Sequence, residues 1–271
     1  MNASAMPMPQ AGNRHGGALK LHRRAIFGEV SNARLQPVLH EKQPLAGDGM
    51  VFAVNNLKLG VPSELPIKRI KGGARNRADR ESHGLTPAQI ANLSAAAGHA
   101  AAIGVPLNRM LTIHWGAAGV PLDGMAAATG RFTDLLAKAI ARHGSRTAWA
   151  WVHENGPKKG WHLHLLAHVP AALVSRMTGL QRGWLRRITG KPYRARVIHS
   201  KPIGGRLGLE ASNPELHAVN LAIARDYILK GASPLAAAQF GLERLEPGGR
   251  IIGKRCGTSQ NIGTKARKAK G

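Results

Sequence analysis

The stretch from Trp149 to Pro170 reads WAWVHENGPKKGWHLHLLAHVP, and it decides the fold of this chain. Residues 147–154 and 162–169 are rich in aromatic and aliphatic side chains, which favour extended structure, whereas the NGPKKG between them is rich in turn formers. The pattern predicts two antiparallel strands joined by a loop that is longer than a two-residue turn.

The two faces of this hairpin differ in chemistry. Side chains alternate across a strand, so His162 and His164 share one face of the second strand, and the reverse face of that strand is apolar. On the first strand Glu154 can lie beside the histidine pair, while His153 takes the reverse face. The hairpin therefore presents a one-sided array of polar side chains.

Glu154, His162 and His164 form a candidate metal site. Two imidazoles and one carboxylate suit Mg²⁺ or Mn²⁺, and also Zn²⁺, with open positions left for substrate oxygens. An H-x-H pair can also arise by chance in a chain with 13 histidines, so structural histidines are the alternative. We expect His168 to be a satisfied histidine at the end of its strand, and His153 to be structural or to face nucleic acid.

Further elements follow on both sides of the hairpin. Thr86, Pro87 and Gln89 form a capping box with proline at the first helical position, and Ser212-Asn213-Pro214-Glu215 reads as a second capping box with proline. Hydrophobic periodicity and these signals predict helices over 86–102, 132–144, 173–188 and 212–230, and further strands over 109–115 and 195–200. This order predicts an α+β fold, a central antiparallel or mixed sheet flanked by helices.

The predicted domain covers 85–235 and lies between two basic segments. Residues 1–84 show little sustained periodicity and are expected to form a largely flexible arm, with short apolar pieces that can still pair with the body. Residues 236–271 are expected to form a basic extension. From Pro247 onward the chain has seven Lys or Arg residues and no acid, which is typical of a solvated tail.

The charge of the chain indicates a polyanionic partner. Lys and Arg total 39 against 14 Asp and Glu, which gives a formal net charge of +25 and a pI near 11.6. No long apolar run predicts a membrane span, so nucleic acid is the expected partner. The single cysteine, Cys256, and the lack of a secretory signal favour the cytoplasm, and the Ala, Gly and Arg content favours a bacterial host cell.

Basic residues are densest around the candidate site. Between Glu154 and Glu210 there are eleven Lys or Arg residues and no acid, which favours a track of phosphate contacts over a merely solvated face. Trp161 and Trp184 could stack on unpaired bases or belong to the core. The expected nucleic-acid contacts are Lys158, Lys159, Arg182, Arg186, Arg187, Arg194 and Arg196.

Together these residues resemble the HUH endonuclease superfamily, the tyrosine nucleases that act on single-stranded DNA. Members carry an H-hydrophobic-H motif on a central strand, matched here by His162-Leu163-His164, and often an acidic or polar ligand about eight residues upstream, matched by Glu154. An earlier strand of the form hydrophobic, hydrophobic, Thr, hydrophobic is matched by residues 110–113. His114 follows where a second Thr is common, so that match is loose.

The resemblance extends to a nucleophile. Members attack with a tyrosine on a downstream helix, often as Tyr-x-x-Lys, and this chain has Tyr227-Ile228-Leu229-Lys230. Residues three apart share a helix face, so Tyr227 and Lys230 can address one phosphate. Leu216, Val219 and Ile223 continue that face, which we therefore expect to turn toward the sheet. The alternative is that Tyr227 is an ordinary core tyrosine.

The resemblance covers residues 107–232 and implies an RRM-like, ferredoxin-like nuclease domain with Mg²⁺ or Mn²⁺ at Glu154, His162 and His164. It implies Tyr227 and Lys230 as catalytic residues, single-stranded or origin hairpin DNA as the substrate, and a host helicase as a further partner. Because the tyrosine follows the histidine motif and stands alone, a single-tyrosine rolling-circle replication initiator of a plasmid or phage is favoured. A mobilisation relaxase, a transposase and a non-catalytic basic nucleic-acid-binding protein are the alternatives.

Overall fold

The structure is a computed structural model in which residues 79–269 are described. These residues belong to one compact unit. The predicted N-terminal arm lies outside the described residues, apart from 79–84. In that short piece Glu81–Ser82 forms β1, which pairs antiparallel with β6, Ile251–Ile252.

The centre of the fold is a five-stranded antiparallel sheet in the order β5-β2-β4-β3-β7. Its strands are β2 (Arg109–Ile113), β3 (Trp149–Gly156), β4 (Gly160–Ala167), β5 (Ile198–Pro202) and β7 (Cys256–Thr258). The first four of these, with two helices, run along the chain as β-α-β-β-α-β. The predicted α+β class, with an antiparallel sheet flanked by helices, is confirmed, and β4 occupies the middle position.

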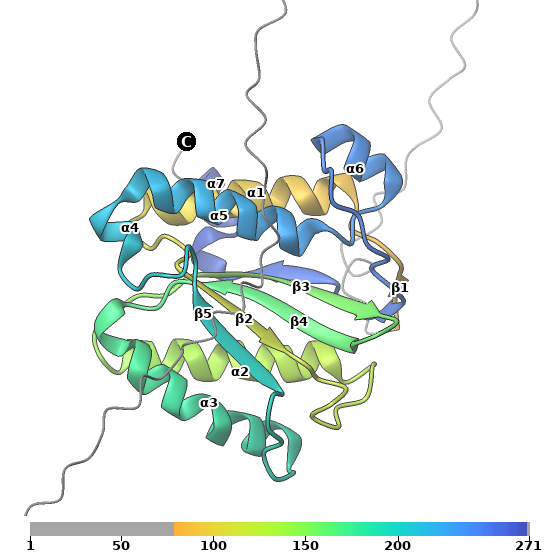
Figure 1. Ribbon diagram of the computed structural model, residues 1–271, viewed down its shortest axis with the longest axis horizontal. Helices are drawn as coiled ribbons and strands as arrows, with labels where there is room; N and C mark the ends of the chain where they lie inside the picture. The colour runs from red at the N-terminus through yellow and green to blue at the C-terminus, as the bar shows by residue number, and fades with distance from the viewer. Residues whose placement is uncertain (1–78, 270–271) are drawn as a thin grey trace, which may run out of the picture. The chain divides into compact units, whose positions relative to one another are not determined.

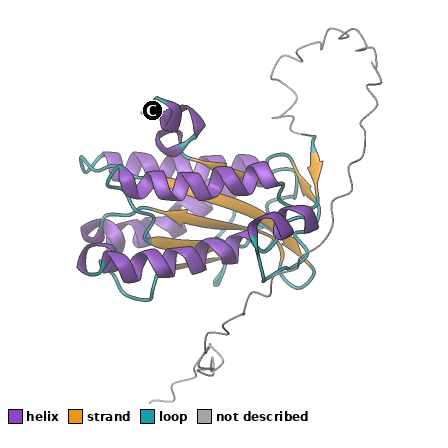
Figure 2. Cartoon of the chain, turned by 90° about the horizontal axis from the view of Figure 1, so that it is seen from above, coloured by secondary structure: helices purple, strands orange, loops and turns teal. Residues whose placement is uncertain are grey.

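Helices cover both faces of the sheet (Figure 1). One face carries α2 (Met125–Ala141) and α3 (Val174–Thr189), and the other carries α1 (Pro87–Ala102) and α5 (Pro214–Leu229). The strands run between these helices (Figure 2). The shorter elements are α4 (Leu209–Ser212), α6 (Pro234–Phe240), α7 (Thr264–Lys268) and the 3₁₀ turns Ala171–Leu173 and Gln260–Ile262.

Alternation along the hairpin strands sorts the core into two clusters, one on each face. Leu163 and Leu165 pack with Phe132 and Trp184 of the α2 and α3 layer. Leu166 packs with the α1 and α5 layer. In the register Glu154 lies opposite His162, and Val152 lies opposite His164. The expected division of faces is confirmed, and the polar array belongs to the α1 and α5 face.

The helix starts follow the sequence signals. Thr86 accepts a hydrogen bond from the Gln89 amide, and the Gln89 side chain reaches back to the Thr86 amide, which closes the capping box of α1. At the start of α5 the cap is Asn213, which accepts from the Leu216 amide, rather than Ser212 of the expected box, which ends α4. Each cap satisfies amides that the first helical turn leaves without partners.

The face that α5 turns to the sheet differs from the expected one over most of the helix, although Tyr227 and Lys230 at its end do turn inward as expected. Leu216, Val219 and Ile223 are 48%, 58% and 64% exposed. The inward stripe instead runs through His217, Leu221, Ala224 and Ile228, at spacings of four, three and four residues. This helix is apolar on more than one side, so periodicity alone does not identify its buried face. The stripe that packs against the sheet begins with a buried histidine, His217.

The segment after Pro247 also differs from the expected solvated tail. It supplies β6 and β7, and Arg255 is only 2% exposed. The Arg255 guanidinium donates to the carbonyl oxygens of Ser82, Gly248 and Gly249, so its charge is buried among backbone dipoles. Strands of two and three residues carry no periodic signal, which is why the sequence does not reveal them.

Gly249 lets this segment cross close to β3. Its φ is +67°, and a Cβ there would lie 1.9 Å from the Asn155 carbonyl oxygen. The neighbouring Gly248 carbonyl accepts from the Asn155 amide at 3.0 Å. Only glycine permits both the left-handed backbone and the close approach. Within 79–269, no helix has the length and apolarity needed to cross a bilayer.

Candidate metal centre

The structure brings the three predicted ligands together. Glu154 lies at the end of β3 and the two histidines near the start of β4, and one ligand atom from each residue falls within 4.8 Å of the others. The Nε2 atoms of His162 and His164 each lie 3.4 Å from Glu154 Oε2. All three side chains are buried. Neighbouring strands of one ladder hold them, so the geometry is fixed by the backbone.

The Nδ1 atoms of both imidazoles each lie within hydrogen-bond distance of a polar partner. His162 Nδ1 lies 2.8 Å from the Gly160 carbonyl oxygen, which only accepts, so Nδ1 carries a proton and the ring is held with Nε2 toward Glu154. His164 Nδ1 lies 3.1 Å from the Thr112 hydroxyl on β2. Partners of this kind orient metal-binding histidines. The sequence placed Thr112 in a motif without giving it this role.

Unsatisfied atoms point to a missing ligand. Among the described residues, the buried side-chain atoms without a hydrogen-bond partner are Glu154 Oε1, His164 Nε2 and His217 Nε2. Two of the three belong to the candidate site. Buried polar atoms are costly to leave unpaired, and a carboxylate oxygen with an imidazole nitrogen is a donor set that a divalent cation accepts. The residues present therefore fit a metal ion.

Lys230 supplies a positive charge at the same place. Its side chain is 3% exposed, and its ammonium contacts Glu154 Oε2 and lies 3.6 Å from Glu246 Oε2. Burial by itself raises the pKa of Glu154, but the imidazoles of His162 and His164 and the Lys230 charge outweigh burial and hold that pKa well below its ordinary value. The expected phosphate-facing lysine is thus paired with a metal-site carboxylate.

Tyr227 lies beside the cluster. Its half-buried ring is 5.1 Å from the His164 ring, centroid to centroid, at an interplanar angle of 75°. Lys230 Nζ and Arg244 Cζ lie 5.0 Å and 4.9 Å from its centroid. Burial and the Glu154 charge raise the tyrosine pKa, while Arg244 opposes them. Arg244 is the cation that lowers this pKa, whereas the Lys230 ammonium is paired with Glu154.

The other tyrosine is excluded from the cluster. Tyr193 packs against the core on the α2 and α3 face, with the Arg182 guanidinium 5.3 Å from its ring centroid. Of the two tyrosines in the chain, Tyr227 is the one that meets the candidate ligands.

His114 and His199 extend the imidazole array, and the sequence did not identify them. The His114 ring is 5.5 Å from the His162 ring and 5.8 Å from the His199 ring. Burial and the neighbouring His162 lower the pKa of His114 to about 4, so its imidazole is neutral. The alternation of side chains along β2 indicates His114 as a neighbour of the site, because His114 is two residues beyond Thr112 and so falls on the same face.

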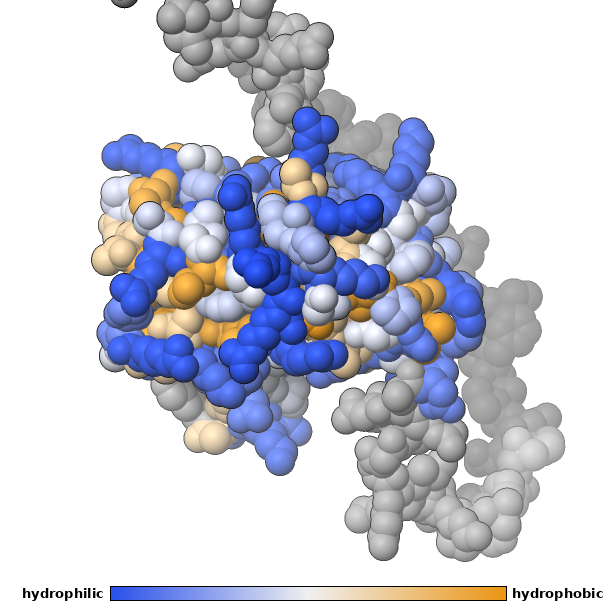
Figure 3. All heavy atoms as spheres, turned by 90° about the horizontal axis from the view of Figure 1, so that it is seen from below, coloured by the Kyte–Doolittle hydropathy of each residue, from blue (hydrophilic) through white to orange (hydrophobic). Residues whose placement is uncertain are grey.

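The basic residues divide between two regions. Lys158 and Lys159 lie in the hairpin loop, and Arg194 and Arg196 lie in the loop before β5, all at the end of the sheet where the cluster sits. The remaining three lie on α3, on the reverse face: Arg182, Arg186 and Arg187. Figure 3 shows that reverse face, where hydrophilic side chains cross a surface with apolar patches. These seven residues therefore do not form a single track around the cluster.

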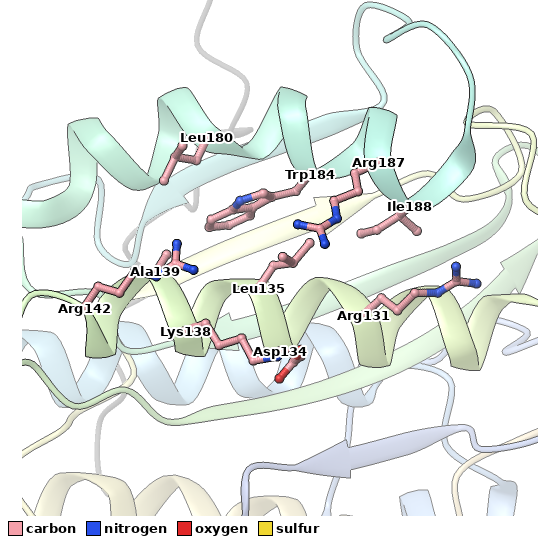
Figure 4. Close-up of a pocket in the computed structure, with 10 residues that line it drawn as sticks. All are labelled: Arg131, Asp134, Leu135, Lys138, Ala139, Arg142, Leu180, Trp184, Arg187 and Ile188. Atoms are coloured by element: carbon pink, nitrogen blue, oxygen red, sulfur yellow. Dashed lines mark ion pairs between the residues drawn. The ribbon is translucent and has the colours of Figure 1, made fainter.

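A groove on the reverse face lies away from the candidate metal centre. It measures about 450 Å³ and runs between α2 and α3, with Leu135 and Trp184 on its floor. Arg131 and Arg142 stand at its two ends (Figure 4). The sheet separates this hollow from Glu154, so it does not serve the ligand cluster.

The other aromatic and imidazole candidates are structural. His153 is fully buried, with Nδ1 and Nε2 each 2.8 Å from a partner, the Lys254 carbonyl and the Thr129 hydroxyl. The Trp161 indole donates to a backbone carbonyl at 2.7 Å, and Trp184 packs edge-on against Phe132. His168 Nδ1 bonds to the Pro106 carbonyl at 2.7 Å, as expected for a satisfied histidine.

No protein-family model, curated protein or solved structure matches this chain.

Proposed function

We propose that this protein cleaves and rejoins single-stranded DNA through Tyr227, with Mg²⁺ or Mn²⁺ held by Glu154, His162 and His164. One observation carries the proposal, namely that the Tyr227 ring packs against the ring of a metal-site histidine. A nucleophile next to a carboxylate and imidazole cluster is the arrangement that metal-assisted phosphoryl transfer requires.

The arrangement of the strands supports this assignment. The order β-α-β-β-α-β with β5-β2-β4-β3 is the ferredoxin-like arrangement that the HUH resemblance implies. The H-x-H pair lies on the middle strand, and Glu154 is the cross-strand partner of His162 on the adjacent one. The proposed class is a single-tyrosine initiator of rolling-circle replication, acting on origin DNA with a host helicase in a bacterial cell.

In the proposed reaction, the metal ligands and Tyr227 have separate roles. When bound, the metal would polarise a non-bridging phosphate oxygen. The Tyr227 oxygen attacks the phosphorus and gives up its proton, the bond to the 3′ oxygen breaks, and the released 3′ oxygen takes up a proton. The DNA 5′ phosphate is then esterified to tyrosine, and the reverse attack by a 3′ hydroxyl reseals the strand without another energy source.

The tyrosine and the loop residues set the conditions for this step. The pKa of Tyr227 is raised, so its proton must leave during the attack rather than before it. Arg244 is the cation that favours the phenolate. Lys158, Lys159, Arg194 and Arg196 surround the same end of the sheet and would hold the backbone phosphates of the strand.

The test is a search for a covalent adduct. Overlapping labelled single-stranded fragments of the DNA that flanks the gene are incubated with the protein and Mn²⁺, and adducts are resolved under denaturing conditions. We expect a metal-dependent adduct that Tyr227→Phe abolishes and the matched variant Tyr193→Phe retains. An adduct lost in Tyr193→Phe but kept in Tyr227→Phe would overturn the assignment.

One observation favours a non-catalytic alternative. The Lys230 ammonium already neutralises Glu154, so the cluster has a counter-charge without any metal. A basic nucleic-acid-binding protein of this kind would bind DNA equally well in EDTA and would never cleave it. A relaxase or a transposase would share the chemistry proposed here, and the DNA site that is cut distinguishes them from an initiator.

A further inference from the structure

Lys230 occupies the position that a metal ion would need. Its ammonium contacts Glu154 Oε2, which is also the oxygen that lies 3.4 Å from the Nε2 atoms of both histidines. A divalent cation and an ammonium repel each other strongly at such a short distance in a buried site. A metal ion bound through this oxygen and the two Nε2 atoms therefore requires Lys230 to leave it.

A second carboxylate stands within reach of the lysine. Glu246 Oε2 lies 3.6 Å from Lys230 Nζ, and Glu246 is exposed to solvent whereas Glu154 is not. The Glu246 amide donates to the Lys230 carbonyl oxygen at 2.9 Å, which ties the two backbones together. Arg244 Nε donates to the Glu246 carboxylate at 3.1 Å. Glu246 is thus held beside Lys230 by contacts that do not involve the metal ligands.

We infer that Glu246 is a positioning residue that receives the Lys230 ammonium when a divalent cation binds to Glu154, His162 and His164, an inference that rests on the metal centre of the proposed function. A buried ammonium without a partner is costly, so a lysine displaced into an apolar interior would oppose metal binding. Glu246 removes that cost. The transfer also leaves Lys230 beside the Tyr227 ring, where the cleaved phosphate would lie.

The two residues have opposite expected effects on metal affinity. Lys230→Met removes the competing cation, so the Kd for Mn²⁺ should fall by about 10-fold or more. Glu246→Gln removes the acceptor for the lysine, so the Kd should rise by about 10-fold, the size of effect that outer-shell partners have on metal sites. Glu243→Gln is the matched control, because it makes the same charge change at an exposed position in the same segment.

A double-mutant cycle separates this mechanism from simple charge attraction. If Glu246 acts through Lys230, Glu246→Gln should have no effect on the Kd in the Lys230→Met background. If Glu246 merely attracts the cation through space, the same 10-fold change should appear in both backgrounds.

The experiment measures Mn²⁺ binding to the full chain by calorimetry, in metal-free buffer without DNA. Opposite shifts in the single variants, an unchanged Glu243→Gln and a vanishing effect in the double variant support the inference. A Lys230→Met protein that binds Mn²⁺ more weakly, or equal Glu246→Gln effects in both backgrounds, overturns it. Where Lys230→Met does not fold, an unchanged Kd in the surface variant Glu246→Gln is sufficient to overturn it.

The outcome for the proposed function is read separately. A wild-type protein that binds no Mn²⁺ contradicts the metal centre and this inference together. A wild-type protein that binds Mn²⁺ and forms the Tyr227 adduct, but shows no coupling between Lys230 and Glu246, contradicts the inference alone.

Discussion

His153 gives the stability of this protein a pH dependence that can be worked out from the structure. Its side chain is fully buried, and burial lowers its pKa from 6.5 to about 3, although the hydrogen bond to the Lys254 carbonyl partly opposes the shift. Both ring nitrogens have partners when the ring is neutral, because Nδ1 donates to Lys254 and Nε2 accepts from Thr129. The folded state therefore resists taking up a proton that the unfolded chain accepts.

The sign and size of the effect follow from this difference in pKa. Above 6.5 neither state is protonated, so the contribution to stability is complete, and it is lost as the pH falls from 6.5 toward 3. Each pH unit below 6.5 costs about 1.4 kcal/mol for one such group. Lowering the pH from about 7.5 to about 5 should therefore reduce the free energy of unfolding by about 2 kcal/mol through His153 alone.

The assay is urea unfolding at both pH values, in EDTA so that no metal contributes. We compare the wild type with His153→Gln and with the control His143→Gln. His143 is an exposed histidine, so its replacement makes the same chemical change at the surface. His114, His164 and His168 also have lowered pKa values, but their contributions are common to all three proteins and cancel. The acid-induced loss should be about 2 kcal/mol smaller in His153→Gln and unchanged in His143→Gln. Equal losses in all three proteins would refute the reasoning.

Two more substitutions test the surroundings of the site. Thr112→Val removes the hydroxyl that orients His164, so Mn²⁺ should bind about 10-fold more weakly in a calorimetric titration, and an unchanged Kd would show that the hydroxyl has no such role. Gly249→Ala places a Cβ against the Asn155 carbonyl and should cost about 3 kcal/mol or more in urea unfolding. Gly241→Ala, at a similar positive φ with open space around it, should cost only about 1 kcal/mol, and equal losses would contradict the steric argument.

Local sequence patterns were enough to predict the hairpin and the grouping of Glu154, His162 and His164 on one of its faces. Alternation along two strands fixes which side chains share a face, and the loop length fixes which residues lie opposite one another. Glu154 and His162 therefore form a cross-strand pair in the structure as the sequence predicts. The caps at Thr86 and Asn213 are equally local, since each depends on residues only three positions away.

Features that depend on distant parts of the chain were not predictable in this way. The partner of Lys230 is a residue 76 positions earlier, and no periodicity links the two. Leu216, Val219 and Ile223 were wrongly predicted to face inward, because more than one apolar stripe is available on α5. The role of Arg255 requires knowing that backbone carbonyls from two separate segments, at Ser82 and at Gly248 and Gly249, converge on it.

The short strand β7 has a consequence for the solubility of the protein. β3 is eight residues long and carries Glu154, and β7 pairs with its middle, from Ala150 to Val152. Without residues 256–258, that long strand would present an unpaired row of amide and carbonyl groups, which is a template for pairing with another chain. β7 has only three residues and follows the exposed Lys254, so it is itself a poor template for pairing. The segment that the sequence predicts to be a solvated tail thus covers part of the edge of β3 and keeps it from pairing with another chain.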